Sequence, residues 1–319
     1  MDILFITSNR LGDAILSTGV LRALGEHYHN ANHAIACGPH AAELFRAAPG
    51  LQRLLVLRKQ PFNRHWLELW QSCVGTRWDV VVDLRNSVVS RLLWARQRAV
   101  KGRSTGQHKV LENAQVLTGL GWQAGDVPPA PYLWLDEEAR AEADSLLRGR
   151  SGFLALAPSA NWPCKQWPVE KFAELAQRLT AVDGALPDAP ILIAAAPNER
   201  GQVEPLLRQI PEDRRIDLIG RPLLTVAACF QRARLFVGND SGLMHMAAAV
   251  GAPTLGLFGP GQEAIYGPFG PHCAVVRTPE SREELLARLP HSGAHAPNLM
   301  ETLSVNAVEE AVRRLVIRS

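Results

Sequence analysis

Three turns in this sequence combine charged or hydroxyl side chains with the expected start of a helix, an arrangement that suits phosphate chemistry. The turns occupy residues 9–13, 158–168 and 238–242, and each follows a short apolar segment typical of a buried strand. Parallel strands end at the same edge of a sheet, and helix N-termini at that edge attract anions. The three turns therefore predict a site for a phosphorylated ligand.

The third turn carries the most specific signal. It lies between an apolar strand at residues 235–237 and an apolar helix at residues 242–250, and its Asn, Asp and Ser side chains are typical of helix caps. The amides of Gly242 and Leu243 are expected at the positive end of the helix dipole, where a phosphate is the usual occupant. His245 follows one turn into the helix, where a structural role is as compatible with the pattern as a catalytic one.

Charged residues in the other two turns are candidates for direct roles. Asp13 is expected at a helix N-terminus, where it serves either as a cap or as a base that accepts a proton from a substrate hydroxyl. Lys165 precedes a helix that is expected to begin at Pro168. Its ammonium could contact phosphate oxygens as a point charge or remain solvated.

Several other site motifs are absent from the sequence. No G-x-G-x-x-G follows a strand and no G-x-x-x-x-G-K-[ST] occurs, which argues against dinucleotide-dependent enzymes and P-loop NTPases. Ser241 does not lie in the G-x-S-x-G motif of hydrolases. The five cysteines lack C-x-x-C spacing, and His291 and His295 lie in a loop without a nearby carboxylate, so no metal site is expected.

The composition is that of a globular protein with two domains of ordinary size. The chain has 319 residues, 47% hydrophobic and 20% charged, and no apolar run reaches the roughly 18 residues of a membrane-spanning helix. The first residues are typical of a strand rather than a secretory signal, and the scattered thiols are expected to be reduced, so a cytoplasmic location is expected. A net charge of +3 is too small to suggest nucleic-acid binding.

One stretch of the chain is strongly basic. No acidic residue occurs between Asp83 and Glu112, and the basic residues of that interval are Arg85, Arg91, Arg96, Arg98, Lys101, Arg103 and Lys109. A solvated helix face would explain this pattern. A surface that attracts an anionic acceptor or an acidic membrane would explain it as well.

Strand-like and helix-like segments alternate through both halves of the sequence. This alternation predicts parallel sheets covered by helices, in two similar α/β domains that face each other across a cleft. An amphipathic helix is expected at residues 305–317, after a loop-rich segment that begins beyond Phe258. The predicted strands occupy residues 3–7, 33–37, 54–57, 80–84, 153–157, 191–195, 216–219, 235–237 and 254–258.

Taken together, the three turns resemble glycosyltransferase family 9, the ADP-heptose:lipopolysaccharide heptosyltransferases. The matching segments are Leu11-Gly-Asp13, Lys165-x-Trp-Pro168, and Gly238-Asn-Asp-Ser-Gly-Leu-Met-His245 with Phe258-Gly-Pro260. The resemblance implies a GT-B fold, in which two Rossmann-like α/β domains with parallel sheets face a central cleft. Residues 1–150 would bind the acceptor and residues 151–303 the nucleotide sugar, and residues 304–319 would form a C-terminal helix that packs back toward the first domain.

The resemblance also implies a reaction and a set of site residues. An inverting, metal-independent enzyme without a cofactor would move heptose from ADP-heptose to a lipopolysaccharide core or a related glycan, with Asp13 as the base. The nucleotide-sugar donor would contact Ser159, Lys165, Asp240, Ser241, Gly242, Leu243 and His245. Further candidates for acceptor binding are Arg10, Arg85 and Arg91.

The partners that the resemblance implies are an ADP-linked donor and an anionic glycolipid acceptor, with peripheral contact on the cytoplasmic face of the inner membrane. Two features depart from the family pattern. Ala160, which has Ser159 beside it, stands where well-known members have a hydroxyl residue near the donor phosphates. Residues 162–164 form an insert that is atypical of the family.

Two other functions are compatible with the same architecture. A nucleotide-sugar 2-epimerase would need several acidic and histidine groups that converge on the sugar ring. A non-catalytic sugar-nucleotide-binding protein would not need Asp13, so the presence of this carboxylate argues against it.

Overall fold

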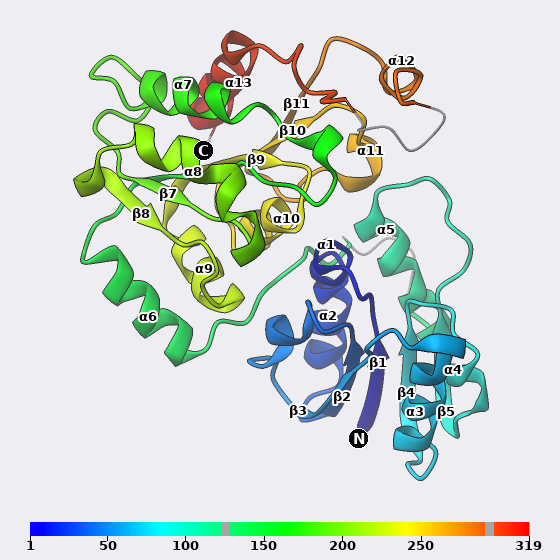
Figure 1. Cartoon of the computed structure of the whole chain (residues 1–319). Coiled ribbons are helices and arrows are strands. Elements are labelled where there is room, and N and C mark those ends of the chain that lie inside the picture. Colours follow the sequence, from blue (N-terminus) through cyan, green and yellow to red (C-terminus); the bar gives the residue numbers. More distant parts are fainter. Residues whose placement is uncertain (123–127, 291–296, 319) are drawn as a thin grey trace. The chain divides into compact units, whose positions relative to one another are not determined.

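The computed structural model describes residues 1–122, 128–290 and 297–318. The chain forms two compact units, Met1–Asp136 and Glu137–Ser319. Each unit contains one parallel sheet with helices packed against it (Figure 1). The predicted α/β fold class, with two Rossmann-like domains, is confirmed.

The sheet of the first unit has the strand order β3-β2-β1-β4-β5. Residues 3–6 of its central strand are fully buried, as expected for a parallel strand that is covered on both faces. The strands are β1 (Asp2–Ile6), β2 (Asn32–Cys37), β3 (Leu51–Val56), β4 (Trp78–Asp83) and β5 (Ala95–Val100). The helices are α1 (Leu11–Ile15), α2 (Thr18–His27), η1 (Ala42–Phe45), η2 (Pro61–Asn63), α3 (Arg64–Cys73), α4 (Val89–Leu92), α5 (Lys109–Ala114) and η3 (Gln115–Leu120).

The sheet of the second unit has the strand order β11-β10-β9-β6-β7-β8. Its strands are β6 (Phe153–Ala157), β7 (Ile191–Ile193), β8 (Arg215–Asp217), β9 (Ala233–Asn239), β10 (Thr254–Phe258) and β11 (Cys273–Arg277). Its α-helices are α6 (Glu137–Leu147), α7 (Val169–Leu179), α8 (Arg200–Gln209), α9 (Leu223–Phe230), α10 (Gly242–Ala249), α11 (Glu263–Tyr266), α12 (Arg282–Leu286) and α13 (Val305–Arg318). Its 3-10 turns are η4 (Pro163–Lys165), η5 (Pro197–Glu199) and η6 (Glu212–Arg214).

Both sheets contain a point at which the strand order reverses. In the second unit the chain proceeds outward from β6 to β7 and β8 on one side, and from β9 to β10 and β11 on the other. The first unit has the same arrangement about β1 and β4. Connections on the two sides of such a point cover opposite faces of the sheet, which leaves a crevice at the carboxyl ends of the two central strands. The topology alone thus indicates where a ligand is expected in each unit.

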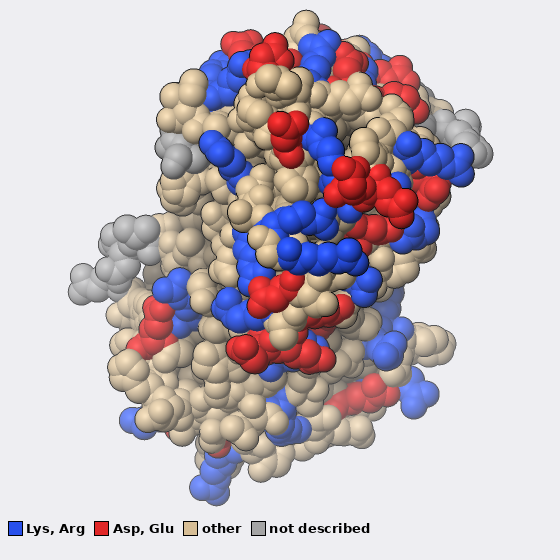
Figure 2. Space-filling model, turned by 90° about the vertical axis from the view of Figure 1, so that its left-hand side faces the viewer, with Lys and Arg blue, Asp and Glu red and all other residues tan. Residues whose placement is uncertain are grey.

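The division between the units falls at residue 136, ahead of the predicted boundary at residue 150. Helix α6 contacts α9 of the second unit, and its Glu142 accepts a hydrogen bond of 2.6 Å from the Thr225 hydroxyl. Glu142 also forms an ion pair with Arg221, and Asp144 forms one with Arg232. Figure 2 shows that acidic and basic side chains are also close to one another elsewhere on the surface that it draws.

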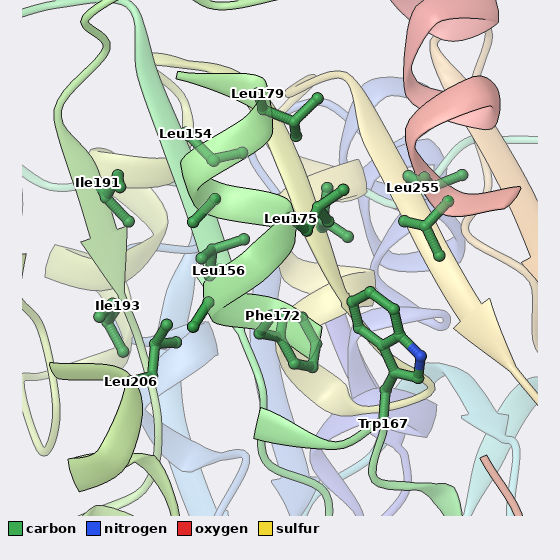
Figure 3. Close-up of a cluster of buried hydrophobic side chains, with 14 of the residues drawn as sticks. Leu154, Leu156, Trp167, Phe172, Leu175, Leu179, Ile191, Ile193, Leu206 and Leu255 are labelled. Carbon is green, nitrogen blue, oxygen red and sulfur yellow. The ribbon is translucent and has the colours of Figure 1, made fainter. Parts of the chain in front are cut away.

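The core of the second unit packs α7, α8 and α13 against one face of the sheet (Figure 3). Phe172 and Leu175 of α7 lie over strand residues such as Leu154 and Leu156. Trp167 meets the Phe172 ring edge-on, with 5.0 Å between the ring centroids, and its indole N–H donates to the Leu303 carbonyl at 2.9 Å. The start of α13 is thereby attached to this core, and the contacts of α13 are made with α7, β10 and β11 of its own unit.

Three elements differ from the sequence-based expectation. The basic stretch contains an edge strand, β5, although a solvated helix face was one of the two explanations offered for its charges. Strand β11 lies in the segment that was expected to be loop. The helix expected to begin at Asp13, for which residues 13–25 have helical periodicity, is divided in the structure into α1 and α2. None of the helices among the described residues combines the length and the apolar character that a membrane crossing requires.

Candidate active site

The crevice of the second unit brings two of the predicted turns together. Lys165 lies in the connection that follows β6, and Asp240 lies in the turn that follows β9, the neighbouring strand. Their side chains form a hydrogen-bonded ion pair between Lys165 Nζ and Asp240 Oδ2. Two residues 75 positions apart therefore meet at the point where the strand order reverses.

The Lys165–Asp240 pair is unevenly exposed. The Asp240 side chain is 8% exposed, whereas that of Lys165 is 25% exposed and its Nζ lies 5.9 Å from the centre of the Trp162 ring. Burial raises the pKa of the Asp240 carboxyl above its usual value, and the charge and hydrogen bond of Lys165 oppose that rise. The ammonium is thus held at the mouth of the site by a carboxylate beneath it.

Asn239 fixes the position of both turns. Its side chain is fully buried, and its amide group donates to the Pro158 carbonyl at 2.7 Å. Its Oδ1 accepts a hydrogen bond of 3.0 Å from the Trp167 backbone N–H. Because these contacts flank Lys165 on both sides in the sequence, Asn239 determines where that lysine lies. Sequence reasoning assigned Asn239 only to capping and so missed this bridging role.

The N-terminus of α10 is open to a ligand. Ser241 occupies the N-cap position in extended conformation, but its side chain makes no capping hydrogen bond. Its hydroxyl oxygen is buried and has no hydrogen-bond partner among the described residues. Gly242 and Leu243 follow in the first turn, and both are partly exposed. Their amides and the Ser241 hydroxyl are the groups for which the sequence predicted an anion site, and they lie together at this helix end.

His245 lies one turn further along α10, and 5% of its surface is exposed. Its backbone N–H donates to the Ser241 carbonyl at 3.5 Å. His245 is therefore a largely buried residue one turn behind the helix N-terminus. This position is compatible with positioning the turn, and it gives no sign of a catalytic role.

The connection after β10 packs against the Asp240 carboxylate. A Cβ atom added to Gly261 would lie 2.5 Å from Asp240 Oδ2, so only glycine permits this approach of the backbone to the carboxylate. Arg277, at the end of β11, holds the same connection: its Nη1 donates to Glu263 Oε1 at 2.6 Å and its Nη2 to the Gly259 carbonyl at 3.3 Å. Sequence reasoning missed the contribution of Arg277 because this residue belongs to β11, in a segment expected to be loop.

Ser159 lies apart from the ion pair. Its hydroxyl is buried and donates to Glu199 Oε2 at 2.7 Å, and the same oxygen accepts a hydrogen bond from the Ala196 N–H at 2.9 Å. Ser159 therefore joins the connections after β6 and β7. Ala160, beside it, is also buried.

The crevice of the first unit brings Asp13 and Arg85 together. Asp13 lies in the first turn of α1, after β1, and Arg85 lies in the connection after β4. Burial lowers the pKa of the Arg85 guanidinium, and the nearby carboxylates of Asp83 and Asp13 oppose that shift. Arg85 Nη1 donates to Asn9 Oδ1 at 2.9 Å. A candidate base and a cation thus share this crevice.

The helix cap considered for Asp13 is not observed. Arg10 occupies the N-cap position of α1, without a side-chain capping bond, and Asp13 is the third residue of the helix. The Arg10 side chain is exposed. The carboxylate of Asp13 is therefore not required to begin α1.

The loop that carries Arg85 is held by Asp83, which is fully buried. Its carboxylate accepts hydrogen bonds from the backbone N–H groups of Arg85 and Ser87, at 2.8 and 2.7 Å, and from the Ser87 hydroxyl. Arg91 lies beyond this loop, exposed, and donates to the Ser87 carbonyl at 2.9 Å. The Arg85 guanidinium also lies 5.3 Å above the centre of the Trp66 ring, which limits its rotation.

No group of three or more His, Cys, Asp or Glu residues is placed to hold a metal ion among residues 1–122, 128–290 and 297–318. His291 and His295 lie outside these described residues. The cations that the described sites offer are side chains, Lys165 in one unit and Arg85 in the other.

The chain consists of two doubly wound units, and one of them has a lysine and an open helix N-terminus at its crevice. This is the GT-B architecture of glycosyltransferases. Comparison with known proteins specifies the family. The model of glycosyltransferase family 9 (heptosyltransferase) matches residues 90–289, a span that includes Lys165 and Asp240. The chain belongs to this family, and the resemblance drawn from the three turns is confirmed.

Individual relatives match along nearly the whole chain. Lipooligosaccharide heptosyltransferase 2 of Haemophilus influenzae is 24% identical, over 97% of this chain and 98% of the relative. A solved family 9 glycosyltransferase from Veillonella parvula has a TM-score of 0.81 at 22% identity, with 100% of this chain and 97% of that one covered. The E. coli heptosyltransferase WaaC, solved with ADP, has a TM-score of 0.75 at 18% identity, with 99% and 100% covered.

Family membership decides between the alternatives that the sequence left open. The chain is a glycosyltransferase rather than a nucleotide-sugar 2-epimerase or a non-catalytic binding protein.

Proposed function

We propose that this glycosyltransferase moves heptose from ADP-heptose to a lipopolysaccharide core or a related anionic glycolipid, with inversion at the anomeric carbon. The observation that carries the proposal is the Lys165–Asp240 pair beside the open N-terminus of α10. This arrangement suits a diphosphate attached to a polyol. The ammonium and the helix amides attract the phosphates, and the carboxylate accepts hydrogen bonds from sugar hydroxyls.

In the donor site, the diphosphate would lie between Lys165 Nζ and the amides of Ser241, Gly242 and Leu243. Lys165 then shares its charge between Asp240 and the phosphates, and it neutralises the negative charge that develops as the diphosphate leaves. Asp240 would be repelled by the phosphates, so its carboxylate is proposed to face the heptose hydroxyls. His245 and Ser159 support the turns that present these groups.

In the acceptor site, Asp13 is proposed as the general base. The acceptor hydroxyl oxygen attacks the anomeric carbon while the bond from that carbon to the diphosphate oxygen breaks on the opposite face. The hydroxyl proton passes to Asp13, and the diphosphate leaves with the bonding electrons. Arg85 would hold an acidic group of the acceptor close to Asp13, with Arg91 and Arg10 as further contacts for an anionic acceptor.

The identity of the substrates is supported by the names of the relatives. They include lipooligosaccharide and lipopolysaccharide heptosyltransferases, and E. coli WaaC has been solved with ADP-2-deoxy-2-fluoro heptose as well as with ADP. A glycolipid acceptor would bring the enzyme to a membrane, so we propose a cytoplasmic location with peripheral contact at the inner membrane.

The test is to incubate the protein with ADP-heptose and a heptose-deficient core acceptor, and to measure ADP release and the mass of the acceptor. Transfer adds one heptose to the acceptor and releases one ADP. Epimerisation would alter the donor without an acceptor present, and mere binding would change neither compound. ADP release with no change in acceptor mass would exclude the proposed transfer.

Activity is expected to persist in EDTA. Lys165 and the N-terminus of α10 supply the positive charge that the leaving diphosphate needs, so the proposed mechanism contains no step that requires a divalent cation. Initial rates measured in EDTA and in added Mg²⁺ should agree. Complete loss of activity in EDTA, restored by Mg²⁺ or Mn²⁺, would show that the side-chain cations are insufficient.

A further inference from the structure

The first unit exposes a set of large apolar side chains on and beside α3 and α4. Leu67 of α3 is 54% exposed, Val88 and Leu92 at the two ends of α4 are 67% and 63% exposed, and Trp94 is 68% exposed. We call these four residues the α3–α4 face. Apolar side chains that are exposed singly are common, but a group of this size on neighbouring elements is typical of an interaction surface.

The packing of the two helices explains why these residues lie on the same side. Helix α3 buries Leu69 and Cys73, and α4 buries Val89, in one hydrophobic cluster. The two helices also contact each other. Leu67, Val88 and Leu92 therefore lie on the sides of these neighbouring helices that turn away from the shared cluster. Val88 and Leu92 are four residues apart and therefore share a side of α4.

Hydrogen bonds within the first unit fix the backbone that carries the α3–α4 face. Arg98 of β5 donates to the Ser90 carbonyl at 2.6 Å and to the Leu93 carbonyl at 2.8 Å, which satisfies carbonyl groups at the end of α4. The Trp94 carbonyl accepts a hydrogen bond of 3.0 Å from the Trp78 N–H. Trp94 is thus presented to solvent by a fixed backbone, with its ring free of the core.

A second exposed aromatic residue lies in η2, the 3-10 turn that directly precedes α3. Phe62 is 97% exposed and has a φ of 53°, in the left-handed region that a bulky side chain rarely adopts. Neither burial nor backbone preference accounts for phenylalanine at this position. Interaction with an apolar medium outside the protein would account for it.

Basic side chains surround the apolar ones. Arg64 of α3, Arg91 of α4 and Arg96 of β5 are exposed, and so is Arg77, which lies between α3 and β4. The Arg77 guanidinium lies 5.0 Å from the centre of the Trp94 ring. The acidic side chain on α3 is Glu68, which accepts hydrogen bonds from Gln60 at 2.9 and 3.0 Å. The charge around the α3–α4 face is therefore predominantly positive.

We propose that the α3–α4 face contacts the surface of an anionic lipid bilayer. Tryptophan and leucine side chains enter the boundary between head groups and acyl chains, while arginine side chains contact lipid phosphates. The exposed arginines on these elements and beside them favour a lipid surface, which carries phosphates, over a protein partner. The inference rests on the proposed function in one respect: a glycolipid acceptor gives the acceptor-binding unit a reason to lie at a membrane.

The test is sedimentation of the full-length protein with sucrose-loaded vesicles. One set contains phosphatidylethanolamine with about one-third phosphatidylglycerol, and the other contains phosphatidylcholine alone. Leu92→Ser and Trp94→Ser are compared with Val182→Ser, a matched control that removes an 86% exposed side chain from the second unit. The sites of all three changes are mostly solvent-exposed, so the fold is expected to survive, and circular dichroism checks this.

The wild-type protein should bind the anionic vesicles and not the neutral ones, and its binding should weaken with salt. Leu92→Ser and Trp94→Ser should each reduce the partition coefficient about five- to tenfold, the loss expected for one partly inserted apolar side chain, and Val182→Ser should not. Phe62→Asn, which suits the left-handed backbone, should reduce it as well without loss of stability.

Absence of vesicle binding by the wild-type protein would overturn the proposal, and so would an equal loss in Val182→Ser. A dimer that Leu92→Ser dissociates, without any vesicle binding, would assign the surface to self-association instead. Transfer to a deacylated, water-soluble acceptor separates this proposal from the proposed function. The surface variants should retain wild-type kcat/KM in that assay, and failure of the wild-type protein there would contradict the transfer reaction but not the lipid contact.

Discussion

At the scale of single residues, the Lys165–Asp240 pair explains how a carboxylate can remain beside a phosphate site. Asp240 is nearly buried, and burial raises the pKa of its carboxyl, whereas the charge and hydrogen bond of Lys165 favour the ionised form. Lys165 is more exposed, so its ammonium can turn toward a ligand without leaving Asp240. Asp240 therefore holds the Lys165 ammonium in position before the donor binds.

Replacement of Lys165 by Ala should mainly weaken donor binding. The ammonium would contact the diphosphate in both the ground state and the transition state, so the donor KM should rise about 10- to 100-fold, with a smaller loss of kcat. Steady-state kinetics with varied donor measures both parameters. Lys59→Ala, which removes an exposed lysine from the first unit, is the control. Unchanged donor kinetics in Lys165→Ala would remove this residue from the site.

Replacement of Asp13 by Asn should reduce kcat steeply and leave folding and donor binding intact. A general base contributes typically ~10²- to 10⁴-fold, and asparagine cannot accept the proton. Because Asp13 is not the N-cap of α1, the fold should not depend on its charge. The measurement is kcat together with the melting temperature and the donor dissociation constant, and Asp183→Asn, at an exposed position of the second unit, is the control. Normal turnover by Asp13→Asn would place the base elsewhere.

From the sequence, residues whose types suit the proposed chemistry could be singled out, but the residues that position them could not. Lys165, Asp240 and Ser241 stand out because charge or hydroxyl groups follow an apolar strand. Asn239 donates a hydrogen bond to the carbonyl of Pro158, 81 residues away, and Arg277 donates one to the carbonyl of Gly259, 18 residues away. Such contacts depend on the strand order, which no local pattern contains.

At the scale of elements, the connection between β5 and α5 is ordered around one buried carboxylate. Glu112 accepts hydrogen bonds from the Ser104 hydroxyl at 2.5 Å, the Thr105 N–H at 2.8 Å and Lys109 Nζ at 3.1 Å. Lys101 Nζ lies 3.4 Å from the same carboxylate. A basic loop at the carboxyl edge of the first sheet is therefore held by a single acidic residue from the adjoining helix.

Glu112 should make the stability of the first unit depend on pH. Burial alone would raise the pKa of its carboxyl, but the bonds from Ser104, Lys109 and Thr105 lower it from 4.5 to about 2. A lowered pKa means that the stabilisation is complete above about pH 5 and is lost as the pH falls toward 2. The shift corresponds to about 3 kcal/mol of unfolding free energy.

Glu112→Gln should remove this pH dependence. Urea unfolding between pH 7 and pH 3, followed by fluorescence, should show a smaller decline in unfolding free energy for the variant than for the wild-type protein. Glu170→Gln, at an exposed position of α7, should keep the wild-type profile and is the control. Parallel profiles for Glu112→Gln and the wild-type protein would show that Glu112 does not carry the pH dependence.

Buried elements were predicted from the sequence more reliably than edge elements. The predicted bounds of β6 and β10 match the structure, because both strands are apolar along their whole length and fully buried. Strand β5 has the sequence Ala-Arg-Gln-Arg-Ala-Val, with its charged side chains in solvent, so it lacks the apolar run of a buried strand. Strand β11 follows several Gly and Pro residues and is also an edge strand.

At the scale of the whole molecule, each unit contains its own hydrophobic core. The cluster beneath α3 and α4 draws its residues from the first unit alone, and the cluster beneath α7, α8 and α13 draws its residues from the second. Both units are also long enough to fold around a separate core. A ligand that contacts only one of the units should therefore stabilise that unit more than the other.

ADP should stabilise the second unit selectively, because Lys165 and the N-terminus of α10 both belong to it. At about 100 times its dissociation constant, a ligand adds ~2.7 kcal/mol, which corresponds to a rise in melting temperature of roughly 5–10 °C for a unit of this size. Hydrogen exchange measured during heating can follow peptides of β6 and β9 separately from peptides of β1 and β4. The first pair should be protected to higher temperature with ADP and the second pair should change little, and Lys165→Ala should reduce the difference. Equal protection of all four strands would show that the two units unfold as one cooperative body, so that ADP stabilises the whole chain at once.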